Sequence, residues 1–186
     1  NPLDAFNYTL YHTSGLPARQ FIALSQNDSL RFRWALGEHL HADPARIEAY
    51  VAGEHGPGKF PLFSTATLDG TPISLDENEK QKVLQEMNQW WKHFLEVSGP
   101  RTAGWTSGAA AGQIIEAIQG RWTGPICCSC IAEENQGYSM GYPAFLNAQG
   151  LVKPAELTLT PEEQAAVTRC QAALKESQQN ILSYLA

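Results

Sequence analysis

The sequence lacks the two kinds of run that would assign it to a membrane or to a nucleic acid. No apolar stretch approaches the roughly 20 residues of a transmembrane helix, so we expect no membrane partner. Lysine and arginine are dispersed, and a net charge of −6 provides no basic surface for phosphates, which argues against a nucleic-acid partner. Neither an initiator methionine nor a signal peptide is present, and we expect these residues to come from within a longer chain.

Cysteine is scarce, and its spacing does not predict a metal site. Three of the four cysteines lie in Cys127-Cys128-Ser129-Cys130, an apolar segment typical of a strand in which cysteine is a small buried side chain. Neighbouring strand residues face opposite ways, so Cys127 and Cys128 cannot readily share a metal ion, and no histidine is near. Reduced thiols are typical of the cytoplasm, which is the expected location.

The 186 residues, 43% of them apolar and 17% charged, are enough for one domain with a sizeable core. Apolar periodicity with start and stop signals predicts strands grouped between long helices, which favours an α+β fold. Thr160-Pro161-Glu162-Glu163 is a capping box with proline at the first helical position. The predicted helices cover residues 4–13, from a cap at Ser25 or Asn27 to 40, 76–97, from Thr106 or Ser107 to 118, and 161–185; the predicted strands cover 21–24, 47–52, 62–68, 122–131 and 142–147.

Two short segments carry the residues of a candidate catalytic site. His55 follows a predicted strand on a glycine-flanked turn, a usual place for a catalytic side chain. Asp28 and Arg31 are three residues apart on a predicted helix and therefore share a face. His55 can protonate a carbonyl oxygen, Asp28 can hold the ring in one tautomer, and Arg31 can grip a carboxylate with two hydrogen bonds. This set suits the reduction of a 2-keto acid. The alternative is that these are scattered surface groups.

The other four histidines have more ordinary interpretations. His12 and His93 fall on helix patterns, while His39 and His41 flank a helix end, where the dipole mildly favours a cation. These last two could bind a metal with Asp43, but an exposed helix end is the simpler interpretation. We therefore expect no metal.

Short motifs follow one another along essentially the whole chain: Asn1-Pro2-Leu3-Asp4, Ser14-Gly15-Leu16-Pro17, Asp28-Ser29-Leu30-Arg31-Phe32-Arg33, Val51-Ala52-Gly53-Glu54-His55-Gly56, Gly104-Trp105-Thr106-Ser107 and Leu157-Thr158-Leu159-Thr160-Pro161-Glu162-Glu163. In this order they resemble the C-terminal, substrate-binding half of the L-lactate/malate dehydrogenase family. The order makes the resemblance far more specific than any single motif.

The resemblance implies a fold, an activity and roles for five residues. The fold would be a mixed or antiparallel sheet with long helices packed on it. His55 and Asp28 would form the proton-relay pair, and Arg31 would clamp the substrate carboxylate. Asn1 would contact the substrate oxygen near the nicotinamide, and Thr106 would form a wall of the pocket. Residues 1–186 would be the substrate-binding and catalytic domain of an NAD-dependent, homo-oligomeric enzyme that interconverts a small 2-hydroxy acid, of lactate or malate type, and its 2-keto acid.

Some features of that family are missing or changed. The sequence has neither Gly-x-Gly-x-x-Gly nor the acidic residue that would hold a ribose, so we expect a separate N-terminal Rossmann domain to bind NAD and the 186 residues alone to be inactive. The family's mobile loop with its second arginine is also absent. Pro57 stands where many members carry an acidic residue, whereas Gly-Trp-Thr-Ser slightly favours the lactate type. The alternative is a non-catalytic assembly or oligomerisation domain that retains the fold.

Overall fold

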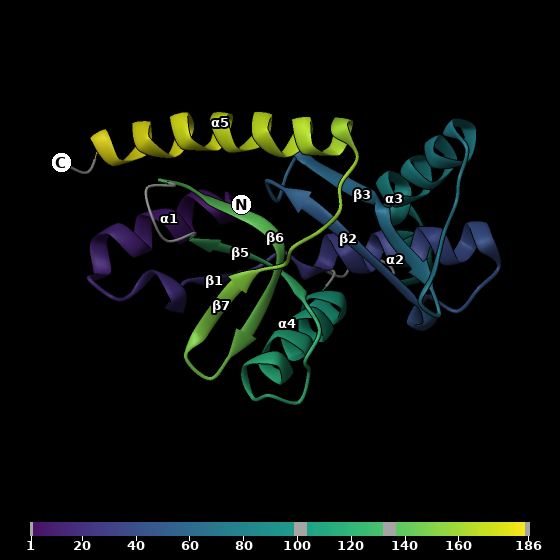
Figure 1. Cartoon of the computed structure of the whole chain (residues 1–186), viewed down its shortest axis with the longest axis horizontal. Coiled ribbons are helices and arrows are strands. Elements are labelled where there is room, and N and C mark those ends of the chain that lie inside the picture. Colours follow the sequence, from purple (N-terminus) through teal and green to yellow (C-terminus); the bar gives the residue numbers. More distant parts are fainter. Residues whose placement is uncertain (1, 99–103, 132–136, 185–186) are drawn as a thin grey trace.

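A seven-stranded sheet, antiparallel at every pairing, forms the centre of the computed structural model, which describes residues 2–98, 104–131 and 137–184 (Figure 1). The strand order is β1-β5-β6-β2-β3-β4, and β7 pairs with β6. The strands are β1 (Ile22–Leu24), β2 (Ile47–Gly53), β3 (Lys59–Leu68), β4 (Thr71–Pro72), β5 (Ile126–Ile131), β6 (Ser139–Asn147) and β7 (Gly150–Pro154). The α-helices are α1 (Leu3–Ser14), α2 (Gln26–Leu40), α3 (Glu77–Ser98), α4 (Gly104–Ile118) and α5 (Pro161–Ser183), and the 3-10 helices are η1 (Ala18–Gln20) and η2 (Pro44–Arg46).

The long helices lie around this sheet, as expected for the α+β class. Helix α5 runs along one side and α4 lies on the opposite side, while α2 and α3 sit together beside β2 and β3 (Figure 1). None of the helices in the described ranges has the length and apolarity needed to cross a bilayer.

The capping box of α5 is confirmed. The Thr160 hydroxyl accepts a hydrogen bond from the Glu163 backbone N–H at 3.2 Å, and Glu163 Oε2 accepts one from the Thr160 N–H at 3.0 Å. Of the two residues predicted to cap α2, Ser25 is at the N-cap and Asn27 lies inside the helix, and the expected side-chain bond is missing. Ser25 occupies the N-cap position without a side-chain capping bond, and the Asn27 amide instead donates to Ser107 Oγ at 3.1 Å. A contact with another helix therefore replaces the local cap.

Several strand boundaries differ from those predicted. Strand β5 begins at Ile126, four residues later than expected, because Pro125 has no N–H to donate to a ladder. Strand β3 begins earlier, at Lys59, where the chain is already paired with β2. Sequence reasoning missed β4 and β7. Strand β7 ends in Lys153 and Pro154 and lacks the alternation of buried and exposed residues that would mark a strand.

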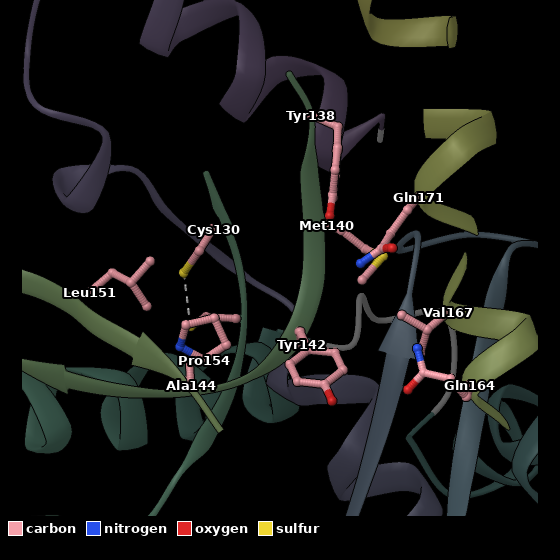
Figure 2. Close-up of a pocket in the computed structure, with 11 residues that line it drawn as sticks. Cys130, Tyr138, Met140, Tyr142, Ala144, Leu151, Pro154, Gln164, Val167 and Gln171 are labelled. Atoms are coloured by element: carbon pink, nitrogen blue, oxygen red, sulfur yellow. Dashed lines mark hydrogen bonds between the residues drawn. The ribbon is translucent and has the colours of Figure 1, made fainter. Parts of the chain in front are cut away.

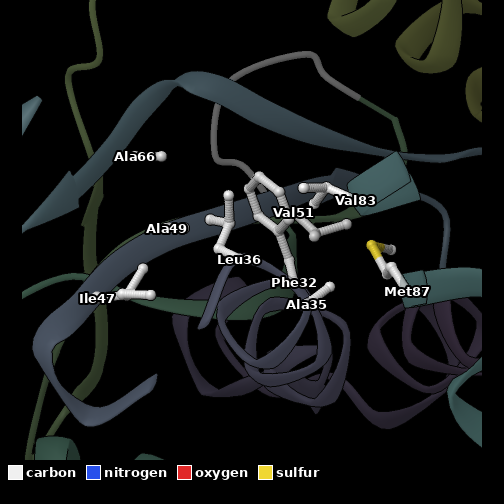
Figure 3. Packing of buried hydrophobic residues seen from close by; sticks show 9 residues of the cluster. All are labelled: Phe32, Ala35, Leu36, Ile47, Ala49, Val51, Ala66, Val83 and Met87. Atoms are coloured by element: carbon white, nitrogen blue, oxygen red, sulfur yellow. The ribbon is translucent and has the colours of Figure 1, made fainter. Parts of the chain in front are cut away.

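The core nearest the site fills the space between α2, β2 and α3. Phe32 and Leu36 of α2 lie against β2, and Val83 and Met87 of α3 close the cluster from the side (Figure 3). Phe32, Leu36 and Val83 are completely buried. The remaining members are Ala35, Ile47, Ala49, Val51 and Ala66. Burying this apolar surface fixes one face of α2, so that its polar residues have defined positions.

Candidate active site

Asp28 enters the site from the first turn of α2, which packs closely on β2 and whose N-cap residue, Ser25, lies against β6. Ser29 Oγ accepts a hydrogen bond from the backbone N–H of Val51 in β2 at 3.0 Å. A Cβ at Gly141 of β6 would lie 2.4 Å from Ser25 Oγ, so a larger residue would push the start of α2 away. Asp28 is consequently held in place and is only 1% exposed.

His55 lies on the turn between β2 and β3, whose path requires glycine. Gly53 has a φ of 103°, and a Cβ there would lie 2.4 Å from the Gly58 carbonyl oxygen. The reversal is tight enough that Gly53 pairs with Lys59 across the hairpin. From α1, Asp4 Oδ2 accepts a hydrogen bond from the backbone N–H of His55 at 2.8 Å. The turn therefore presents the imidazole at a defined position.

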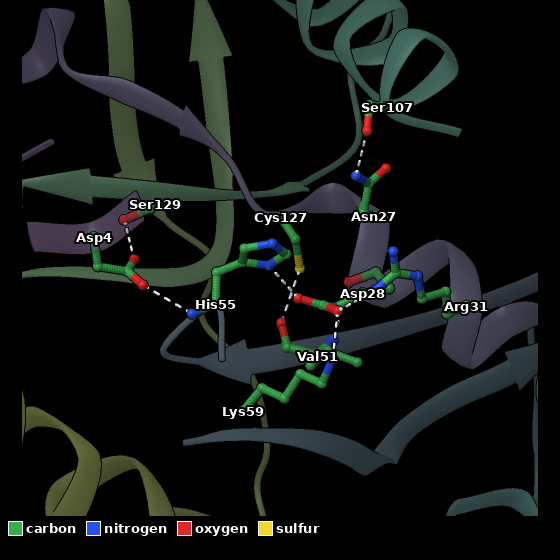
Figure 4. Close-up of polar contacts among 11 residues, drawn as sticks. Asp4, Asn27, Asp28, Arg31, Val51, His55, Lys59, Ser107, Cys127 and Ser129 are labelled. Carbon is green, nitrogen blue, oxygen red and sulfur yellow. Dashed lines mark hydrogen bonds and ion pairs between the residues drawn. The ribbon is translucent and has the colours of Figure 1, made fainter. Parts of the chain in front are cut away.

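The His55 ring and the Asp28 carboxylate are in direct contact. Nδ1 of His55 is 2.6 Å from Oδ2 of Asp28 (Figure 4). The structure thus brings together two residues that sequence reasoning paired and that lie 27 positions apart. Because Asp28 engages Nδ1, any proton exchanged with a substrate is carried on Nε2.

Two further cations surround Asp28. Lys59 Nζ lies 2.8 Å from Oδ1, and Arg31 Nη1 lies 3.3 Å from the same oxygen. Burial of Asp28 opposes its ionisation, but hydrogen bonds from His55 and Lys59 and their charges outweigh that effect, so its pKa is lowered. Asp28 is therefore an anion at neutral pH and can stabilise a protonated imidazole. Sequence reasoning missed Lys59, which belongs to none of the motifs.

Arg31 has spare hydrogen-bonding capacity beside this pair. Its guanidinium carbon lies 4.4 Å from the centroid of the Trp90 ring, so a cation–π contact with α3 orients the side chain. Its Nε is buried and has no hydrogen-bond partner among the described residues. A buried donor normally has an acceptor, and the planar fork of arginine matches a carboxylate. The side chain as a whole is 22% exposed, so a carboxylate ligand can reach the guanidinium group from solvent.

Asp4 is a second buried carboxylate at the site and was also missed. Its Oδ1 accepts a hydrogen bond from Ser129 Oγ, which also lies 2.7 Å from Ser139 Oγ. Burial raises the pKa of Asp4, and the bonds from Ser129 and His55 only partly counter it. The Asn-Pro-x-Asp motif contained Asp4, but nothing in the sequence indicated that it would meet the His55 turn.

Two of the predicted site residues are less well defined. Thr106 lies, half-buried, in the first turn of α4, next to Ser107. Because the Asn27 amide donates to Ser107, the start of α4 lies beside the start of α2. Asn1 lies outside the described residues. The roles assigned to Thr106 and Asn1 stay predictions.

The three cysteines of β5 divide between its two faces, and the fourth, Cys170, lies on α5. Cys127 Sγ donates to the Val51 carbonyl oxygen at 3.4 Å, and burial raises the pKa of Cys127 to about 11. Cys128 and Cys130 face the other way, with their sulfur atoms 3.3 Å apart. They line a cavity of about 260 Å³ between the sheet and α5 (Figure 2), together with Tyr138, Met140, Tyr142, Ala144, Leu151, Pro154, Gln164, Val167 and Gln171. The described ranges contain no group of three or more His, Cys, Asp or Glu residues that could hold a metal.

The sequence matches a known family over most of its length. The family described as lactate/malate dehydrogenase, alpha/beta C-terminal domain, matches residues 26–184. The chain belongs to this family. It is 32% identical to L-lactate dehydrogenase of Halalkalibacterium halodurans over 98% of the chain, and 30% identical to L-lactate dehydrogenase 2 of Bacillus cereus over the same share. It spans 60% and 61% of the length of these two relatives.

Solved structures of both kinds of family member share the fold. A minor L-lactate dehydrogenase from Enterococcus mundtii superimposes with a TM-score of 0.84 at 23% identity, over 97% of this chain and 61% of that one. A malate dehydrogenase from Cryptosporidium parvum gives a TM-score of 0.85 at 23% identity, over 98% and 62%. The α+β lactate/malate dehydrogenase fold predicted from the motifs is therefore confirmed.

Proposed function

We propose that the protein carrying this chain is an NAD-dependent 2-hydroxyacid dehydrogenase, and that residues 1–186 are its substrate-binding and catalytic domain. The observation that carries the proposal is the contact between His55 and Asp28 at 2.6 Å, with Arg31 beside the same carboxylate. A general acid, the carboxylate that orients it and an anion clamp are the groups that reduction of a 2-keto acid requires.

Arg31 binds the substrate in this proposal. Its guanidinium donates two parallel hydrogen bonds to the carboxylate of the 2-keto acid, and each charge-assisted contact contributes about 1.5–3 kcal/mol. The partial exposure of the Arg31 side chain, 22%, supports this role, because a ligand can reach its guanidinium group. Holding the carboxylate fixes the adjacent carbonyl relative to His55.

His55 moves the proton. Protonated His55 donates from Nε2 to the carbonyl oxygen as the carbonyl carbon is reduced, leaving a 2-hydroxy acid and a neutral imidazole. Asp28 keeps Nδ1 protonated throughout and stabilises the imidazolium before transfer. In the opposite direction, neutral His55 accepts the proton from the hydroxyl group.

The hydride comes from NADH when that cofactor is bound. These residues contain no dinucleotide-binding motif, and the relatives extend well beyond the matched region, which supports a separate N-terminal Rossmann domain for NAD. The isolated chain would then be inactive, and the complete protein would be a homo-oligomer.

All four cysteines are free thiols, which supports the cytoplasm as the location of the protein.

We propose that the substrate is of the lactate type. The Gly104-Trp105-Thr106-Ser107 element supports this choice, as do the similar proteins named L-lactate dehydrogenase. Pyruvate should accordingly be reduced with a higher kcat/KM than oxaloacetate. The opposite preference would assign the protein to the malate type.

Replacement of the proposed acid tests the function. In the complete protein, His55→Ala should lower kcat/KM for the 2-keto acid by about 100- to 10,000-fold, the usual range for a positioned acid or base, with little change in NADH affinity. The matched control is His93→Ala, because His93 is 51% exposed on α3 and pairs with surface glutamates. Equal activity of His55→Ala and the control would reject the assignment. A complete protein without 2-keto acid reduction would favour an assembly role instead.

A further inference from the structure

Lys59 is built into the same charge cluster as the catalytic pair. It is the first residue of β3, and its Nζ lies 2.8 Å from Oδ1 of Asp28 while the His55 ring binds Oδ2 (Figure 4). The carboxylate is therefore shared between Lys59 and Arg31 on Oδ1 and the His55 ring on Oδ2. The Lys59 side chain is 24% exposed, so solvent only partly screens its charge.

The hairpin itself dictates this contact. Lys59 pairs with Gly53, and a Cβ on Gly53 would lie 3.0 Å from the Lys59 Cα. The glycine lets the two backbones meet where β2 ends, and the Lys59 side chain then lies under the carboxylate of Asp28 (Figure 4). Its position follows from the strand register and does not depend on a flexible surface loop.

We propose that Lys59 is a positioning residue that holds one oxygen of Asp28 and sets the pH at which His55 gives up its proton; this rests on the function proposed above. The ammonium ion satisfies Oδ1, which leaves Oδ2 directed at Nδ1 of His55. It also draws on the same negative charge that stabilises the imidazolium and repels that cation directly. Lys59 therefore favours neutral His55.

The other charged groups around His55 define how large this effect is. Asp4 and Glu54 are negative, and Arg31 is the second cation on Asp28. The Cys127 thiol faces Asp28 from β5, and its pKa of about 11 keeps it neutral in the working range. With these groups unchanged, removing the charge of Lys59 should move the pH dependence of the reaction to higher pH, because one of the cations near His55 is gone.

The test is the pH dependence of Lys59→Met in the complete protein. The falling limb of kcat/KM for 2-keto acid reduction and the rising limb for 2-hydroxy acid oxidation should both move to higher pH. Loosening of the fold would lower both activities without moving either limb. Lys59→Arg keeps the charge and should restore the wild-type midpoints.

A measurement without substrate separates this inference from the proposed function. The ring signals of His55, identified by their loss in His55→Gln, can be titrated by NMR in the wild-type protein and in Lys59→Met. Their midpoint should move to higher pH in Lys59→Met, even if the protein lacks dehydrogenase activity. Lys59→Gln replaces Lys59→Met if the latter does not fold. Lys80→Met is the matched control, since Lys80 lies on α3 beside Glu77. An unchanged or lowered midpoint in the Lys59 variant would overturn the inference.

Discussion

Two buried carboxylates hold His55 from opposite sides, and their surroundings differ. Asp28 binds the ring through Oδ2 and meets two side-chain cations, Lys59 and Arg31, at Oδ1. Asp4 binds the backbone N–H of His55, and its other described partner is the neutral hydroxyl of Ser129. The exposed fractions are almost equal, 1% for Asp28 and 2% for Asp4. Burial therefore cannot account for any difference in their ionisation.

The partners decide the direction in which each carboxylate shifts. Burial is the largest influence on both groups and raises both pKa values. Around Asp28 it is outweighed by His55 and Lys59, and the pKa is lowered; around Asp4 the neutral donors are too weak, and the pKa is raised. The Asp28 carboxylate is therefore suited to stabilising a cation, and the Asp4 carboxylate is suited to holding the backbone N–H of His55 in position.

The largest expected difference between the two is catalytic. In the complete protein, Asp28→Asn should lower kcat/KM for the 2-keto acid by about 10- to 1,000-fold and shift its pH profile, because the ring loses its orienting charge. Asp4→Asn should lower it less than about tenfold, since an amide oxygen still accepts the His55 N–H. Steady-state kinetics over a range of pH values measures both. Equal losses of kcat/KM in the two variants would mean that Asp28 acts only by stabilising the local structure.

The stability of the two variants should diverge with pH. Asp28 has a lowered pKa, so its stabilising contribution is present above its unfolded pKa of about 3.8 and is lost as pH falls through the lower folded value. Asp4 has a raised pKa, so stability decreases as pH rises from about 3.8 through its higher folded value. At pH 7, Asp28→Asn should lower the free energy of unfolding by about 1.5–3 kcal/mol, because Lys59 and Arg31 lose a charged hydrogen-bond acceptor.

Asp4→Asn should behave in the opposite way. Relative to wild type, its free energy of unfolding should rise as the pH increases from about 3.8 through the raised folded pKa of Asp4, because the amide carries no charge to bury. Denaturant titrations followed by tryptophan fluorescence at several pH values give both curves. Parallel pH dependences for the two variants would contradict the contrast between charged and neutral partners.

The sequence was most informative where a residue's partner lies in a recognisable motif. Asp28, Arg31 and His55 were identified because each lies in a motif, and the structure brings the three together. The contact of Lys59 with Asp28 depends on the register of the β2–β3 hairpin, in which β3 begins earlier than predicted. The contact of Asp4 with the His55 backbone joins α1 to a turn about fifty residues away. It is a tertiary contact that no local sequence pattern indicates.

The same distinction applies to the fold. Helices were predicted well because apolar periodicity and caps are local signals, as Thr160 and Glu163 illustrate. Strand β7 was missed because it is held by pairing with β6 and has little pattern of its own. The cap of α2 failed for a related reason: Asn27 bonds to α4 and not to its own backbone. Long-range contacts decide these features.

The smallest effect is expected at Asp69, an exposed carboxylate that completes the comparison. Asp69 pairs with Arg46 across the surface, which lowers the pKa of Asp69, but both side chains are more than half exposed. Solvent and salt screen such a pair, so Asp69→Asn should leave the denaturation midpoint within experimental error. Asparagine also tolerates the left-handed φ of 50° at this position, whereas Asp69→Ala would strain the turn and lower the midpoint further. If Asp69→Asn destabilised the protein as much as Asp28→Asn, burial of the carboxylate would not be the reason that an ion pair contributes to the stability of this protein.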